Sequence, residues 1–118
     1  MTPEEARRIL AESRARIDAI DVQLVMLLNQ RTSVVEDIGR AKDAVGLPIY
    51  EPKREDDVYR NVLASNAGPM TADALKRIFE RIIDEMRSLQ RMRRAQREAS
   101  PESPDRKTPD HKKGQAGC

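Results

Sequence analysis

The chain has 118 residues, of which 36% are charged and only 3% are aromatic, and its formal net charge is +2. This length allows one domain at most, and this composition is typical of a long-helix protein rather than a β-sandwich or a barrel. The small net charge does not by itself indicate nucleic acid binding. The single cysteine, Cys118, cannot form a disulfide within the chain, and no stretch approaches the length of a membrane span. We therefore expect a cytoplasmic protein without a membrane segment.

The first predicted element is a long helix from Pro3 to about residue 44. Proline suits the first helical turn, and Glu4 and Glu5 are favourable at the positive end of the helix dipole. Gly46 and Pro48 are typical of a helix end. Some 40 residues at 1.5 Å each make a rod of roughly 60 Å, whereas a domain of about 100 residues has a radius of gyration near 13 Å. The rest of the chain cannot cover such a rod, so we infer a dimer in which two long helices pair.

Apolar residues recur along this helix at alternating steps of three and four, which is the pattern of one buried helix face. This apolar stripe comprises Ile17, Ile20, Leu24, Leu27, Val34, Ile38 and Ala41. Arg31 stands in the stripe where an apolar residue is expected, and Lys42 falls on nearly the same side three turns later. A charge on a buried face is costly unless it is paired. An ion pair across the dimer interface would satisfy Arg31, Lys42 could simply complement the helix dipole, and a bound anion would satisfy both.

Two further helices are predicted, over residues 53–64 and 72–97, with Thr71 as the N-cap of the second. The residues expected to face inward are Val58, Val62 and Leu63 in the first, and Leu75, Ile78, Phe79, Ile82, Ile83, Met86 and Leu89 in the second. Gln90 lies on the same side as this last group, where it either bonds a backbone carbonyl, marks an exposed edge or faces a ligand. Residues 98–118 hold three prolines and many charges, and we expect a disordered tail in which His111 is solvated.

The polar groups predicted to face inward are Arg31, Lys42 and Gln90, and the region between the first two helices adds Glu51, Arg54 and Glu55. The sequence contains no cysteine and histidine set with metal-ligand spacing, no glycine-rich phosphate loop and no paired serine and histidine. Cations with one neutral amide and no nucleophile suit a small polyanion. We therefore predict a site for a small polyanion that uses neither a metal nor a cofactor.

Four segments, in this order and spacing, resemble the all-helical class of chorismate mutase: SRARIDAIDVQLVMLLNQR, IGRAK, GLPIYEPKRE and IIDEMRSLQ. The resemblance covers roughly residues 6–94. It implies an intertwined homodimer of three-helix chains, with two equivalent active sites built from both chains. It also implies the rearrangement of chorismate to prephenate in the shikimate pathway to phenylalanine and tyrosine. We take residues 1–97 as this helical domain.

The resemblance assigns the groups that would act on the substrate's carboxylates and on its breaking ether oxygen. Arg14 matches the arginine that crosses from the partner subunit to a carboxylate, and Arg31 matches the one that holds a carboxylate from the site's own chain. Lys42 matches the lysine that reaches the ether oxygen and a carboxylate, and Gln90 matches the second donor to that oxygen. These four are the expected catalytic residues.

Four more positions are expected to contact the substrate. Glu55 matches the acid that accepts the substrate hydroxyl, helped by the backbone near Glu51, and Arg54 matches a supporting arginine of the carboxylate network. Two residues depart from the family pattern: Met86 stands where a small polar residue, commonly serine, is frequent, and Glu51 stands where aspartate is common. The Met86 departure bears on binding strength rather than on the type of reaction.

Three alternatives stay open. An isochorismate-pyruvate lyase shares this fold and also uses the lysine, although the segment GLPIYEPKRE with its hydroxyl-binding acid favours the mutase. A non-enzymatic dimeric helical module could bind nucleic acid phosphates through the basic end of the third helix, although a solvated helix end also explains these arginines. They are Arg87, Arg91, Arg93, Arg94 and Arg97. A purely structural coiled coil requires neither the short second helix nor the loop before it.

Overall fold

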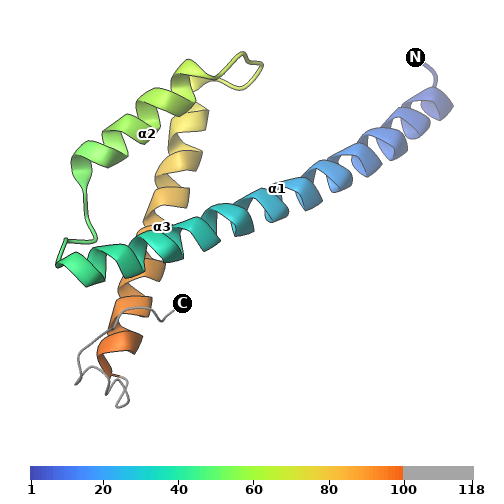
Figure 1. The fold of residues 1–118 in the computed structure, drawn as a ribbon. Helices are drawn as coiled ribbons and strands as arrows, with labels where there is room; N and C mark the ends of the chain where they lie inside the picture. The colour runs from blue at the N-terminus through green and yellow to red at the C-terminus, as the bar shows by residue number, and fades with distance from the viewer. Residues whose placement is uncertain (100–118) are drawn as a thin grey trace. The chain divides into compact units, whose positions relative to one another are not determined.

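The computed structural model describes residues 1–99, which form three helices and their connecting loops without a strand. α1 spans Pro3–Val45, α2 spans Pro52–Ala64 and α3 spans Ala72–Ala99 (Figure 1). The predicted all-α class and the three helices are confirmed, and their ends differ from the predicted ones by two residues or fewer. The predicted tail lies outside the described residues, His111 included, except that residues 98 and 99 belong to α3. None of the helices in residues 1–99 has both the length and the apolar character of a membrane span.

The start of α1 is capped by its own side chains. The backbone N–H of Glu5 donates to Thr2 Oγ1 at 3.1 Å, and the backbone N–H of Thr2 donates to Glu5 Oε1 at 2.8 Å. This reciprocal pair is a capping box, which satisfies backbone N–H groups that have no partner within the helix. The predicted start of the helix at Pro3 is therefore explained by local chemistry alone.

Residues 1–34 and residues 35–99 form two compact units. In the first unit, the apolar stripe predicted to be buried is exposed in the single chain: Ile17 and Leu27 have exposed fractions of 56% and 59%. In the second unit, the buried residues of α1 are Val35, Gly39 and Lys42. Ile38 and Ala41, which continue the stripe, are also exposed in the single chain, and the adjacent side of the helix packs inward.

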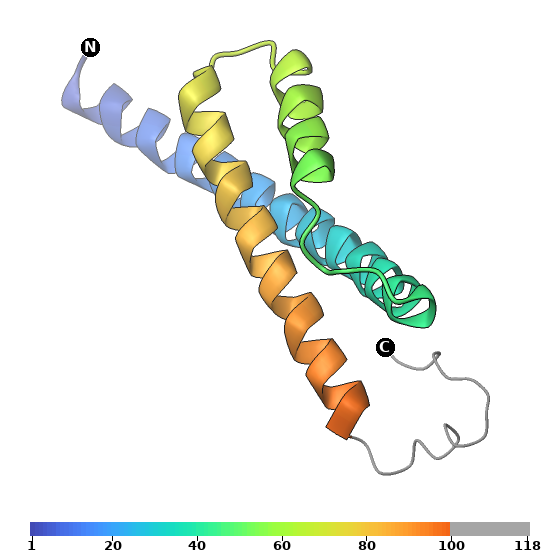
Figure 2. The same cartoon turned by 90° about the vertical axis from the view of Figure 1, so that its left-hand side faces the viewer.

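α2 and α3 lie side by side and run in opposite directions, joined by the loop at residues 65–71 (Figures 1 and 2). Ile83 and Met86 of α3 are buried at the centre of this unit. Most of the other residues expected to face inward are half-buried, but Ile78 is exposed. The predicted N-cap is confirmed, because Thr71 Oγ1 accepts a hydrogen bond from the backbone N–H of Ala74 at 3.2 Å.

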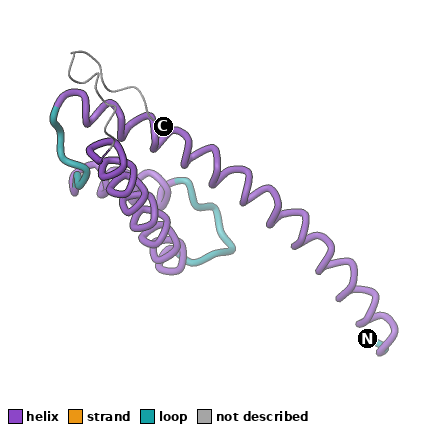
Figure 3. The backbone as a smooth tube through the Cα atoms, turned by 90° about the horizontal axis from the view of Figure 1, so that it is seen from below, coloured by secondary structure: helices purple, strands orange, loops and turns teal. Residues whose placement is uncertain are grey.

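The end of α1 turns the chain back along the helix (Figure 3). Gly46 has a φ of 74°, in the left-handed region that glycine adopts without steric cost. The N–H of Leu47 donates to the carbonyl oxygen of Lys42 at 2.8 Å, and the N–H of Gly46 donates to the carbonyl oxygen of Asp43 at 3.4 Å. This is the Schellman motif. It directs the following residues of the loop toward the side chain of Lys42.

Candidate active site

Lys42 lies in the last turn of α1 and is 93% buried, since its exposed fraction is only 7%. Its Nζ donates to the carbonyl of Ile49 at 2.8 Å and pairs with Glu51 Oε1 at 2.8 Å. A lysine that only complemented the helix dipole would need neither this burial nor these two partners. An ammonium group has three N–H donors, and two of them are used here. The third is available to a ligand.

Gln90 of α3 lies against the side of α1 that carries Gly39 and Lys42. A Cβ added to Gly39 would lie 3.7 Å from Gln90 Cγ, and Gly39 and Lys42 share one face of α1 because they are three residues apart. The Oε1 atom of Gln90 is buried and has no hydrogen-bond partner among residues 1–99. A buried acceptor left unsatisfied costs about 1–3 kcal/mol. The amide of Gln90 is therefore not held by the protein at this atom, and the prediction that it faces inward is confirmed.

Glu55 of α2 and Arg87 of α3 form an ion pair between the two helices. Nη2 and Nε of Arg87 donate to Glu55 Oε2 at 2.6 and 3.1 Å. The hydrogen bond to Glu55 raises the pKa of Arg87 further above its usual range. The guanidinium also lies 5.1 Å from the centre of the Tyr50 ring. Because Tyr50 is next to Glu51 in the loop, Arg87 connects Glu55 to the part of the loop that holds Lys42.

Tyr59 lies one turn after Glu55 on α2 and is half-buried. Burial raises the pKa of its phenol, and the negative charges of Glu55, Glu80 and Asp84 raise it further. The ammonium of Lys76 lies 5.5 Å from the centre of its ring. Tyr59 is therefore a neutral hydrogen-bonding group throughout the physiological pH range.

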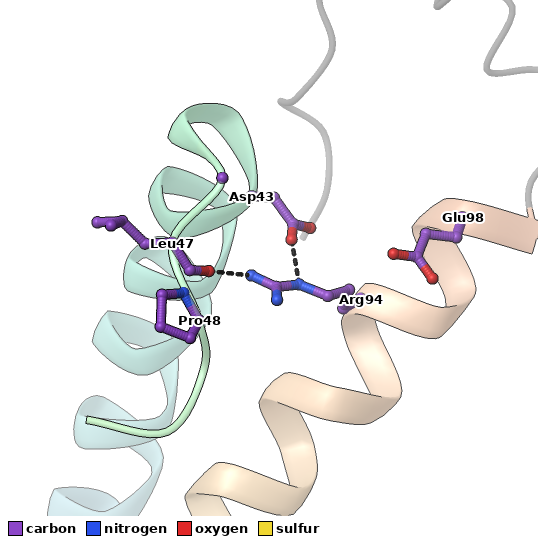
Figure 4. Close-up of a pocket in the computed structure, with 6 residues that line it drawn as sticks. Asp43, Leu47, Pro48, Arg94 and Glu98 are labelled. Atoms are coloured by element: carbon purple, nitrogen blue, oxygen red, sulfur yellow. Dashed lines mark hydrogen bonds and ion pairs between the residues drawn. The ribbon is translucent and has the colours of Figure 1, made fainter. Parts of the chain in front are cut away.

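The arginines near the end of α3 pair with carboxylates of α1. Arg93 Nε donates to Glu36 Oε2 at 2.8 Å, and Arg94 and Arg97 both pair with Asp43. Arg94 Nη2 also donates to the carbonyl of Leu47 at 3.0 Å (Figure 4). A shallow pocket of about 360 Å³ is found here, lined by Asp43, Gly46, Leu47, Pro48, Arg94 and Glu98. Together with the pair of Arg87 and Glu55, these contacts give four of the five arginines of the basic helix end a structural role, which weakens the nucleic acid alternative.

Five of the predicted site residues in the second unit are buried or take part in these contacts: Lys42, Glu51, Glu55, Met86 and Gln90. Arg54, in the first turn of α2, is exposed. Arg14 and Arg31 belong to the first unit, in which Arg14 is exposed and Arg31 is half-buried.

Sequence reasoning missed Arg87 and Tyr50 as members of this cluster. Arg87 was interpreted only as part of a basic helix end, because its partner Glu55 is 32 residues away. No local spacing connects the two, and only the pairing of α2 with α3 does. The acidic partner could have been found by asking which carboxylate on α2 faces the buried side of α3.

Residues 13–91 match the model of the protein family described as chorismate mutase type II. The chain belongs to this family. The predicted resemblance to the all-helical class of chorismate mutase is thereby confirmed. Within residues 1–99, no group of three or more histidine, cysteine, aspartate or glutamate side chains is placed to hold a metal ion.

Two solved structures of chorismate mutase from Thermus thermophilus have the same fold. The form II structure superposes with a TM-score of 0.68 at 32% identity, over 71% of this chain and 94% of that one. The form I structure gives 0.63 at 33% identity, over 67% and 98%. These similarities extend over nearly the whole of each Thermus chain, so this chain contains the full fold of those chorismate mutases.

The matches to curated relatives cover only part of each relative. The bifunctional chorismate mutase/prephenate dehydratase of Aquifex aeolicus is 35% identical over 86 residues, which cover 70% of this chain and 24% of the relative. The chorismate mutase of Methanocaldococcus jannaschii is 38% identical over 53 residues, which cover 45% of this chain and 54% of the relative. The chain therefore spans about a quarter of the first relative and about half of the second.

Proposed function

We propose that this chain is a chorismate mutase, an isomerase that converts chorismate to prephenate in the cytoplasm, on the pathway to phenylalanine and tyrosine. The observation that carries the proposal is that Gln90 packs against Gly39, on the face of α1 that carries buried Lys42, and that the protein leaves Gln90 Oε1 without a hydrogen-bond partner among residues 1–99. These residues lie on the fold of a family whose solved members include chorismate mutases.

The reaction is a rearrangement within one molecule, so it requires no protein nucleophile. The enzyme must hold a dianion in a compact conformer and stabilise the negative charge that grows on the ether oxygen. Lys42 and Gln90 would donate hydrogen bonds to that oxygen. Turning the Gln90 amide toward the substrate sacrifices no hydrogen bond at Oε1, because that atom has no partner among the described residues. Donors of this kind are worth more in the transition state than in the ground state.

The carboxylates of the substrate would be held by Arg31 of the same chain and by Arg14 of a second copy. A planar guanidinium matches a carboxylate with two parallel hydrogen bonds. Glu55 would accept a hydrogen bond from the substrate hydroxyl. The backbone near Glu51 and the Arg54 side chain would support the site. Since Arg14 would come from another chain, we propose a homodimer that pairs through the apolar stripe of α1.

The test is the loss of chorismate absorbance in the presence of the purified chain, with the product identified as prephenate. We expect turnover by the wild type and its loss in Arg31→Ala. Inertness toward chorismate, with release of pyruvate from isochorismate, would replace this proposal with the lyase alternative. Inertness toward both substrates, with a salt-sensitive shift of nucleic acid on a gel, would support the binding module.

The pH dependence of Gln90→Glu tests the donor role of this residue. A glutamine amide does not titrate, so this position should cause no loss of wild-type activity between about pH 5 and pH 8. A glutamate there donates only while it is protonated, and the ordinary pKa of glutamate is about 4.3. We expect kcat/KM of the variant to be highest at the acid end and to fall as the pH rises.

The control for this measurement is Gln96→Glu, which introduces the same charge at an exposed position of α3. Its profile should follow the wild type. A Gln90→Glu enzyme that keeps a flat profile near the wild-type rate would rule out hydrogen-bond donation by residue 90.

A further inference from the structure

The contact between Arg87 and Glu55 uses only one of the two carboxylate oxygens. Nη2 and Nε of Arg87 both donate to Oε2, at 2.6 and 3.1 Å, and both side chains are about four-fifths buried. Among the described residues, Oε1 of Glu55 accepts no hydrogen bond. The carboxylate is therefore held from one side, and an acceptor oxygen is left with its lone pairs available.

Arg87 is itself fixed by groups other than Glu55. Its Nη1 atom lies 3.3 Å from Asp84 Oδ1, one turn earlier on α3. Its guanidinium lies against the ring of Tyr50, whose neighbour Glu51 pairs with Lys42. The side chain thus contacts α2, the loop before it and its own helix. A guanidinium held at several points is a rigid support for a carboxylate.

We propose that Arg87 is a positioning residue that keeps the Glu55 carboxylate turned so that Oε1 accepts the hydrogen bond of the substrate hydroxyl. This inference rests on the proposed function, because it assigns the substrate contact of Glu55. Without Arg87, the glutamate side chain would regain its rotamers, and part of the binding energy would be spent on ordering it. A purely structural ion pair between α2 and α3 is the competing explanation, and the two differ in what they predict for catalysis.

A double-mutant cycle on chorismate distinguishes them. Arg87→Met keeps much of the apolar stem but removes the charge, and we expect it to lower kcat/KM about ten- to a hundredfold, which corresponds to the loss of a hydrogen bond to a charged group. In the background of Glu55→Gln, the same substitution should have little further effect, because the group that Arg87 positions is already altered. Arg87→Lys, which retains a cation and one donor, should recover part of the loss.

A chorismate analogue that lacks the hydroxyl provides the second measurement. Arg87→Met and the wild type should turn over this analogue at similar rates, since the contact that Arg87 supports is absent. The control is Arg81→Met, because Arg81 is an arginine of the same helix whose ion pair with Glu85 is exposed. It should behave as the wild type with both substrates. Thermal unfolding of every variant measures the structural share of the effect.

The positioning role would be overturned if Arg87→Met lowered kcat/KM equally in the wild type and in Glu55→Gln, or equally with chorismate and with the analogue. Either result would leave a structural ion pair. A wild-type chain that does not convert chorismate would overturn the proposed function, and this inference with it. An active wild type with an additive cycle would overturn the inference alone. The two failures are therefore separable in one set of assays.

Discussion

Replacing Lys42 with alanine is expected to lower kcat for chorismate by about a hundred- to a thousandfold, the usual loss when one preorganised donor to a developing oxyanion is removed. Two N–H groups of this lysine are held by Ile49 and Glu51, which aims the third. The alanine side chain reaches no acceptor. A water molecule that replaced the ammonium would carry no charge and would not be preorganised.

The fold should survive this substitution, so the loss should be chemical. Glu51 is 45% exposed, and water can solvate its carboxylate once the lysine is removed. The matched control is Lys53→Ala, which removes an exposed lysine at the start of α2. Steady-state kinetics and thermal unfolding of the two variants make the comparison. A rate for Lys42→Ala close to the wild type would contradict the assignment of the site.

The second large effect is expected from Leu27→Lys, which should convert the proposed dimer to monomers and abolish turnover. Leu27 is 59% exposed in the single chain, so the substitution removes little packing within it. In a symmetric dimer each change occurs twice. Burying a leucine contributes about 1.5–3 kcal/mol, so losing two copies should weaken association by about a hundredfold or more, since each 1.4 kcal/mol is tenfold in the dissociation constant.

Turnover should disappear together with the dimer, because a monomer would lack the Arg14 that we propose the second copy supplies. Asn29→Lys is the control, since residue 29 lies on the opposite side of α1 from the stripe. It should remain a dimer and stay active. Light scattering or sedimentation gives the mass, and the chorismate assay on the same samples gives the activity. A Leu27→Lys chain that is still dimeric and active would exclude the stripe as the interface.

The local chemistry of the sequence was sufficient to predict the helices. Their periodicity, the proline at the start of α2, the Thr71 cap and the glycine after α1 all act over a few residues, so the predicted ends agree with the structure to within two residues. The same periodicity predicted that Lys42 and Gln90 face inward. Each of these features depends on the chemistry of near neighbours, which can be read without knowing how the helices pack.

Only the tertiary structure decided which groups meet. The pairing of Arg87 with Glu55, and of three further arginines with Glu36 and Asp43, joins residues 32 to 57 positions apart. The sequence contains many carboxylates and many arginines, and the packing of the helices decided which of them form ion pairs. Packing also chose the side of α1 that carries Val35, Gly39 and Lys42 over the adjacent side with Ile38. The sequence by itself therefore determined the helices and the polar residues that stand on their apolar faces, because these depend on local backbone and side-chain preferences. The partners of each charge were decided by the tertiary structure, because a helix face is chosen by what lies opposite it.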